Sequence, residues 1–249
     1  MLEIKGLAKS FGGIIVADNI DLIMRSGRIL GLIGPNGAGK TSLFNLVSGL
    51  YPPNAGSVSL DGKPLDGLPL HERARLGLAR TWQHVRLFPS LSVLDNLIMG
   101  ARHYPAESLA TLMLRPGKIR AAATAASAKA RDILARIGLP EAADKSIADL
   151  PYGQQKLVGV GRALMNDARC LLLDEPMAGV EGQAYEAMQK IVREVAHAGV
   201  AVCVVEHNIA FIRDLCDEAV FMFQGRILAR GSIAELIDNP ELTELYFGH

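Results

Sequence analysis

A glycine-rich segment near the N-terminus has the residue types and spacing of a phosphate-binding loop. Residues 34–41 read Gly-Pro-Asn-Gly-Ala-Gly-Lys-Thr and fit the pattern Gly-x-x-x-x-Gly-Lys-Ser/Thr. Glycines let main-chain N–H groups approach phosphate oxygens closely, and a following helix points its positive end at the anion. Lys40 could then reach the β- and γ-phosphates of a nucleotide, and the Thr41 hydroxyl could contact Mg²⁺. The alternative is a glycine-rich turn that carries Lys-Thr by chance.

Two carboxylates follow an apolar run later in the chain. Residues 171–173 are leucines, and Asp174, Glu175 and Pro176 come next. In open α/β sheets, ligands bind at the carboxyl ends of strands, which would bring these carboxylates to the phosphate loop. We expect Asp174 to hold Mg²⁺ through a water, and Glu175 to orient or deprotonate a water that attacks the γ-phosphate. The alternative is a strand end whose charges only aid solubility.

The elements that must position these groups are predicted from hydrophobic periodicity and from turn residues. Strands are expected at 2–8, 14–24, 29–33, 57–60, 170–173, 200–205, 219–223 and 226–230. Helices are expected at 40–49, 70–76, 90–100, 106–113, 118–137, 154–166, 182–197 and 208–215. Residues 232–235, Ser-Ile-Ala-Glu, fit a capping box that opens a C-terminal helix.

The order of these elements predicts an α/β fold. Strands alternate with helices in the last third, which implies a mostly parallel sheet with helices on both faces. The first 65 residues add antiparallel strands, and the middle of the chain predicts only helices. We therefore expect a single domain over 1–249, in which an α/β core formed by 1–83 and 166–249 carries a helical insertion at 84–165.

Composition and charge exclude several classes of protein. The chain has 249 residues, with 26 basic against 26 acidic side chains and 49% hydrophobic residues, which is too apolar and too balanced for a disordered chain. A neutral net charge does not indicate the basic surface that binds nucleic acid, so no nucleic-acid partner is expected. No targeting segment is visible, and the apolar runs fall well short of the roughly 18–20 residues that span a bilayer.

The three cysteines, Cys170, Cys203 and Cys216, lack the spacing of metal ligands. They indicate buried thiols in a reducing compartment. These observations together predict a soluble, cytoplasmic protein that takes part in membrane processes only through partners.

The motifs as a set resemble the nucleotide-binding subunit of ATP-binding cassette (ABC) transporters, over nearly the whole chain. Five motifs follow the family's order: the phosphate loop at 34–41, a glutamine loop at Gln83, a signature sequence at 150–154, the acidic strand at 170–175 and a switch histidine at His207. The resemblance implies a P-loop ABC ATPase core with an antiparallel β section and an inserted helical subdomain. It also implies ATP and Mg²⁺ as cofactors.

The resemblance assigns roles to individual residues. The implied catalytic residues are Glu175, His207, Lys40 and Gln83, and the implied Mg²⁺ ligands are Thr41, Gln83 and Asp174. The implied ATP-binding residues are Phe11, Gly34, Pro35, Asn36, Gly37, Ala38, Gly39, Lys40, Thr41 and Ser42, with Tyr152, Gly153 and Gln154 reaching the ATP of an opposite subunit. Phe11 stands where the family stacks an aromatic ring on adenine; a core phenylalanine is the alternative.

Two segments depart from the family's usual text. The signature reads Leu-Pro-Tyr-Gly-Gln in place of Leu-Ser-Gly-Gly-Gln, and Pro151 supplies neither a hydroxyl nor an N–H. Residues 178–181 read Ala-Gly-Val-Glu in place of Ser-Ala-Leu-Asp. The first departure puts full-speed hydrolysis in doubt at the site that this loop completes.

Within the family, three stretches are similar to the ATPases of branched-chain amino-acid importers: residues 80–88, a signature tyrosine followed by Gly-Gln-Gln, and Asn239-Pro240-Glu241 leading to Tyr246. This implies an importer ATPase for small solutes, with branched-chain amino acids expected. Hydrolysis would occur at a head-to-tail dimer interface, with a second copy or a different ATPase subunit as the partner.

The same resemblance implies membrane permease subunits as partners, contacted through the surface around 82–96. It also implies an indirect link to a solute-binding protein, and a peripheral location on the cytoplasmic face of the inner membrane. Two alternatives stay open: a soluble ABC ATPase, and a weakly hydrolysing, ATP-gated regulatory subunit.

Overall fold

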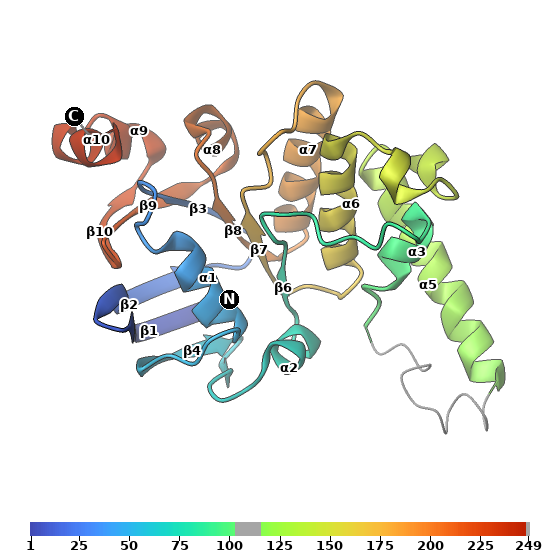
Figure 1. The fold of residues 1–249 in the computed structure, drawn as a ribbon, viewed down its shortest axis with the longest axis horizontal. Coiled ribbons are helices and arrows are strands. Elements are labelled where there is room, and N and C mark those ends of the chain that lie inside the picture. The colour runs from blue at the N-terminus through green and yellow to red at the C-terminus, as the bar shows by residue number, and fades with distance from the viewer. Residues whose placement is uncertain (103–115, 248–249) are drawn as a thin grey trace.

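The strand that precedes the phosphate loop lies inside a six-stranded sheet. In the computed structural model, which describes residues 1–102 and 116–247, the strand order is β10-β9-β3-β8-β7-β6 (Figure 1). These strands are β3 (Ile29–Ile33), β6 (Leu78–Arg80), β7 (Cys170–Asp174), β8 (Ala201–Val205), β9 (Glu218–Phe223) and β10 (Arg226–Gly231). All neighbours are parallel except β9 and β10. The carboxyl ends of β3, β6, β7 and β8 therefore lie at one edge.

The continuous apolar runs of the sequence become the centre of this sheet. Every residue of β3, β7 and β8 is buried, as expected for parallel strands that are covered on both faces. Cys170 and Cys203 lie in these strands and are buried, whereas Cys216 is only partly buried.

A second, antiparallel sheet forms from the N-terminal part of the chain. Its order is β2-β1-β4-β5, with β1 (Leu2–Phe11), β2 (Ile14–Met24), β4 (Ala55–Leu60) and β5 (Lys63–Pro64). Helix α1 (Lys40–Ser48) lies between the two sheets, because Leu43 and Phe44 share one core cluster with residues of both.

The remaining helices lie around the two sheets. They are α2 (Leu70–Arg75), α3 (Val93–Ile98), α5 (Pro116–Arg136), α6 (Tyr152–Leu164), α7 (Gln183–His197), α8 (Ile209–Leu215), α9 (Ile233–Ile237) and α10 (Pro240–Phe247). Figure 1 shows α3, α5 and α6 together at one end, with α9 and α10 at the other. None of the described helices is both long and apolar enough to cross a membrane.

The expected strands and helices are confirmed wherever the structure describes them, apart from their exact bounds. The expected helix at 106–113 lies outside the described residues. The helix expected at 90–100 is shorter, because Ser92 caps its start by accepting a hydrogen bond from the N–H of Asp95. Strand β6 was not expected. The capping box formed by Ser232 and Glu235 is present.

Candidate active site

The phosphate loop follows β3, and at two of its positions only glycine can be accommodated. Gly34 has a φ of 148°, and a Cβ there would lie 2.0 Å from the main-chain oxygen of Met222. Gly39 has a φ of 102°, and a Cβ there would lie 2.5 Å from the main-chain oxygen of Val16. The pattern glycines are thus required by close packing against β9 and β2, in addition to any ligand.

Lys40 is the first residue of α1, and its side chain turns back into the loop. Its Nζ donates hydrogen bonds to the main-chain oxygens of Gly34 at 2.7 Å and Pro35 at 2.9 Å. Burial lowers the pKa of Lys40, while the nearby charges of Glu175 and Asp174 oppose that shift. A cation therefore occupies the curve of the loop. Thr41 beside it is exposed.

Asp174 ends β7 with its carboxylate only 2% exposed. One oxygen, Oδ2, accepts a hydrogen bond from Nη2 of Arg80 at 2.9 Å. The other, Oδ1, is buried and has no hydrogen-bond partner among the residues that the structure describes. A buried carboxylate oxygen that lacks a donor is a suitable ligand for a hard cation such as Mg²⁺. The donor set at this strand end therefore fits the metal that the sequence implied.

Glu175 lies next to it, at the centre of a contact between three elements. Its Oε2 accepts a hydrogen bond from Nε2 of Gln83 at 2.8 Å, and its Oε1 lies 3.2 Å from Nε2 of His207. The carboxylate is 18% exposed. Gln83 follows β6 and His207 follows β8, so the parallel sheet brings together three side chains that are far apart in the sequence.

Two buried charged residues beside the Glu175 cluster were not predicted from the sequence. Lys156 on α6 is buried, and its Nζ donates to the main-chain oxygens of Glu175 and Gln83. Burial lowers the pKa of Lys156, and the charges of Glu206, Glu175 and Asp174 oppose the shift. The sequence feature that could have indicated Lys156 is a lysine on the inward face of a helix whose other inward residues are apolar.

Glu206 is the second missed residue, and it is 4% exposed. Its carboxylate accepts hydrogen bonds from the N–H groups of Met177 at 2.6 Å and His207 at 3.0 Å. Burial raises the pKa of Glu206, while these N–H donors oppose the shift. Glu206 thus joins the loop after β7 to the residue that contacts Glu175. A carboxylate directly after the apolar run of β8 was the signal for it.

The remaining predicted residues do not join this cluster. Phe11 is 42% exposed, so it is not a core phenylalanine, and its ring contacts Tyr51 edge-on at 5.4 Å between centroids. Residues 152–154 start α6, and across the described chain none of them hydrogen-bonds to the phosphate loop. The ring of Tyr152 instead lies against Gly179.

Comparison with known proteins identifies the family. A family model described as ABC transporter matches residues 17–178. The high-affinity branched-chain amino acid transport ATP-binding protein BraF of Pseudomonas aeruginosa is 35% identical over 250 residues, covering 100% of this chain and 98% of the relative. The corresponding LivG protein of Salmonella typhimurium is 34% identical with the same coverage. The lipopolysaccharide export system ATP-binding protein LptB of Escherichia coli is 32% identical, covering 99% of this chain and 97% of the relative.

Solved structures agree with the sequence relatives. A nucleotide-free ATP-binding cassette from an ABC transporter superposes with a TM-score of 0.86 at 28% identity, over 100% of this chain and 99% of the other. A cassette in its ADP conformation gives a TM-score of 0.85 at 28% identity, with the same coverage. The phosphate loop, the acidic strand end and these full-length matches lead to one conclusion: the chain belongs to the ABC transporter family, as a nucleotide-binding subunit whose ATPase activity is coupled to transport.

Proposed function

We propose that the cluster around Glu175 is where this chain hydrolyses ATP. The observation that carries the proposal is the Glu175 carboxylate, which contacts both Gln83 and His207 at the carboxyl end of β7. A carboxylate held by two neighbours is suited to orient an attacking water and to accept its proton. His207 can donate a hydrogen bond to charge that develops on the γ-phosphate.

The remaining roles are those that the family resemblance implies. Lys40 would exchange its loop carbonyls for phosphate oxygens, and Phe11 would stack on adenine. Thr41, Gln83 and Asp174 would hold Mg²⁺, which when bound neutralises charge on the β- and γ-phosphates. The unpartnered Oδ1 of Asp174 supports that assignment.

We propose further that ATP is bound between two subunits placed head to tail. Residues 152–154 have no hydrogen bond to the phosphate loop within the described chain. The N–H of Gln154 donates to the main-chain oxygen of Pro151 at 2.9 Å, which leaves the N–H groups of Tyr152 and Gly153 at the start of α6 for an anion. They would therefore act on the ATP of a partner, either a second copy or a different ATPase subunit. Removal of the γ-phosphate would release the dimer.

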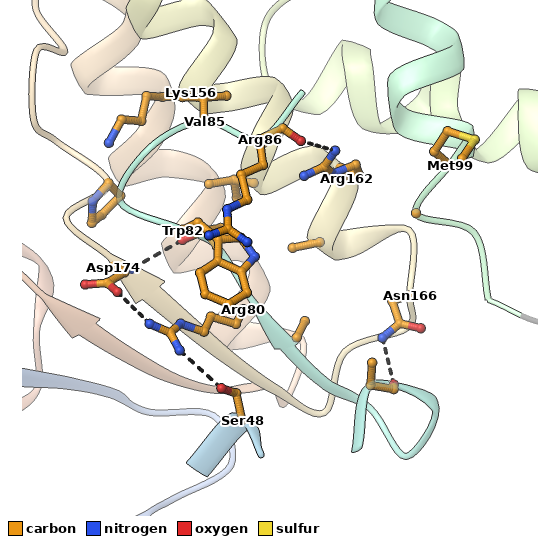
Figure 2. Close-up of a pocket in the computed structure, with 18 of the residues that line it drawn as sticks. Ser48, Arg80, Trp82, Val85, Arg86, Met99, Lys156, Arg162, Asn166 and Asp174 are labelled. Carbon is orange, nitrogen blue, oxygen red and sulfur yellow. Dashed lines mark hydrogen bonds and ion pairs between the residues drawn. The ribbon is translucent and has the colours of Figure 1, made fainter. Parts of the chain in front are cut away.

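A groove beside this cluster supplies a surface for the membrane partner. The Trp82 groove has a volume of about 450 Å³, and it is lined by Trp82, Val85, Arg86, Phe88, Met99 and Arg162 among others (Figure 2). It lies where the proposed helical subdomain at 84–165 meets the proposed core at 1–83 and 166–249. Docking of a permease there would place the chain, as a peripheral subunit, on the cytoplasmic face of the inner membrane.

We propose import of branched-chain amino acids as the transport process. LivG and BraF, whose names specify that process, align with this chain from end to end, and a solute-binding protein would then act upstream of the permease. LptB, from a lipopolysaccharide export system, aligns almost as fully, which makes export the competing direction.

Two experiments test these proposals. Steady-state phosphate release should fall about 100-fold in His207→Ala and stay unchanged in His197→Ala, which alters an exposed histidine at the end of α7. Equal rates in both variants would contradict the assigned cluster.

Mass spectrometry of what co-purifies from native membranes in mild detergent tests the transport process. Two multispanning proteins, together with either a second cassette ATPase or a second copy of this chain, would support the importer, and their binding protein would identify the solute. Recovery of soluble partners alone would contradict it.

A further inference from the structure

One arginine joins the two elements that supply Thr41 and Asp174, two of the three proposed magnesium ligands. Arg80 ends β6, and its side chain is 5% exposed. Its Nη2 donates to Oδ2 of Asp174 at 2.9 Å, while its Nη1 donates to Oδ1 of Asn45 at 2.7 Å and to Oγ of Ser48 at 3.1 Å. Figure 2 shows the contacts with Asp174 and Ser48 on opposite sides of the guanidinium.

These contacts tie the acidic strand end to the phosphate-loop helix. Asn45 and Ser48 lie on α1, the helix that begins with Lys40 and Thr41. Asp174 lies on β7. The spacing between Thr41 and Asp174 therefore depends on the planar guanidinium of Arg80, a fork whose N–H donors point to both elements.

Charge neutralisation alone does not explain this arrangement. A buried arginine loses hydration, and an ion pair with Asp174 compensates for only part of that loss. A positive charge next to a carboxylate also opposes the binding of a cation there. The fork does, however, occupy Oδ2 and leave Oδ1 without a donor. This orients the carboxylate so that a specific oxygen is left free.

The same guanidinium contacts the Trp82 groove. Its central carbon lies 4.5 Å from the centroid of the Trp82 ring, and that of Arg86 lies 4.1 Å from the same centroid. Stacked guanidinium and aromatic planes restrict each other's orientation. Trp82 is the single tryptophan of the chain, so all tryptophan fluorescence comes from the ring that Arg80 and Arg86 contact.

We propose that Arg80 is a positioning residue for the metal. It sets the orientation of Asp174 relative to α1, and it connects that carboxylate to the Trp82 groove. This inference rests on the proposed function, since it takes Asp174 and Thr41 as two of the metal ligands.

The test uses the full chain with Mn²⁺ and ADP as probes. Mn²⁺ affinity in the presence of ADP is measured by the electron paramagnetic resonance signal of free Mn²⁺, and ADP affinity is measured separately in EDTA. Arg80→Lys keeps the charge and loses the fork, whereas Arg80→Gln loses the charge as well. Arg73→Lys is the matched control: Arg73 is also buried and hydrogen-bonds to main-chain oxygens of α1, at Leu46 and Val47.

We expect both Arg80 variants to lose about tenfold in Mn²⁺ affinity, the size typical of residues that orient metal ligands. ADP affinity in EDTA should stay within about twofold, since the phosphate loop is unchanged. The Trp82 emission should change in both Arg80 variants and not in Arg73→Lys. Because Arg80→Lys leaves Asp174 beside a cation, it keeps the test valid if Arg80→Gln does not fold.

Three results would overturn the inference. Wild-type Mn²⁺ affinity in Arg80→Lys would show that the charge alone matters, and tighter Mn²⁺ binding in Arg80→Gln would show that Arg80 opposes the metal. Unchanged Trp82 emission would remove the link to the groove. Failure of the wild-type chain itself to bind ADP would count instead against the proposed function.

Discussion

Lys156 donates a hydrogen bond from Nζ to the main-chain oxygen of Glu175 at 2.7 Å, and Glu175 has a left-handed backbone with a φ of 47°. Such a backbone costs about 1–3 kcal/mol for a residue other than glycine, so it needs support from its surroundings. Lys156 also donates to the main-chain oxygen of Gln83 at 3.0 Å. The helix that begins with the signature residues thus holds the backbone at two members of the proposed catalytic cluster.

Replacing Lys156 by methionine should therefore affect both stability and turnover. Two buried acceptors lose a charged donor, and we expect the free energy of unfolding to fall by about 2 kcal/mol. We expect kcat to fall about tenfold, because the Glu175 carboxylate is no longer fixed toward the water. Urea unfolding and steady-state phosphate release measure the two effects.

Lys129→Met is the control for this substitution. Lys129 joins α5 to the end of α6, through a hydrogen bond to the main-chain oxygen of Met165 at 2.9 Å, but it does not touch the cluster. The Lys129→Met substitution should lower the free energy of unfolding and leave kcat unchanged. A wild-type kcat in Lys156→Met would contradict the supporting role.

The buried carboxylate of Glu206 should make stability depend on pH in a specific direction. Burial raises the pKa of Glu206 above its ordinary value of 4.5, so in the window just above pH 4.5 the folded chain binds more protons than the unfolded chain. Stability that this group contributes must then fall as pH rises through that window. The stability of wild type minus that of Glu206→Gln, from thermal unfolding at several pH values, should decrease from pH 4.5 upward. A difference that increases with pH would contradict the burial argument.

Pro151 should limit the stability of α6, because it cannot cap the start of that helix with a side-chain hydrogen bond. It occupies the N-cap with a φ of −53° and a ψ of 148°, and its side chain makes no capping hydrogen bond. Serine suits that backbone and could accept a hydrogen bond from a first-turn N–H, so Pro151→Ser should add about 1 kcal/mol of capping energy relative to Pro151→Ala. If the missing hydroxyl also limits hydrolysis, the serine variant should have the higher kcat of the two. Equal stability of the two variants would contradict the capping account.

Most elements of the fold could be predicted from local patterns. The central strands β3, β7 and β8 are apolar throughout, and the capping box fixes the start of α9. Strand β6 could not be predicted, because the three residues Leu78–Arg80 are too few to display a period. It joins the sheet through pairing with β7, which is a long-range contact.

The candidate site could be predicted only in part. Lys40, Asp174 and Glu175 follow from motif chemistry, whereas Gln83 and His207 needed the family resemblance. Arg80, Lys156 and Glu206 were missed because their partners lie on other elements, at Asp174, Gln83 and Met177. In the sequence, each of the three is a charged residue inside or beside an apolar run. A buried charge needs a partner, but the sequence does not show which residue that partner is.

The most direct test of the account is ATP hydrolysis by Glu175→Gln. The amide keeps the shape of the side chain and cannot accept the proton of the attacking water, so phosphate release should fall at least about 100-fold. Binding of ATP should persist, and light scattering with excess Mg-ATP should show a dimer of this chain or of its pair with a second ATPase subunit. Glu194→Gln, which changes a partly exposed carboxylate on α7, should hydrolyse like the wild type. An equal rate of phosphate release in wild type and Glu175→Gln would contradict Glu175 as the catalytic carboxylate.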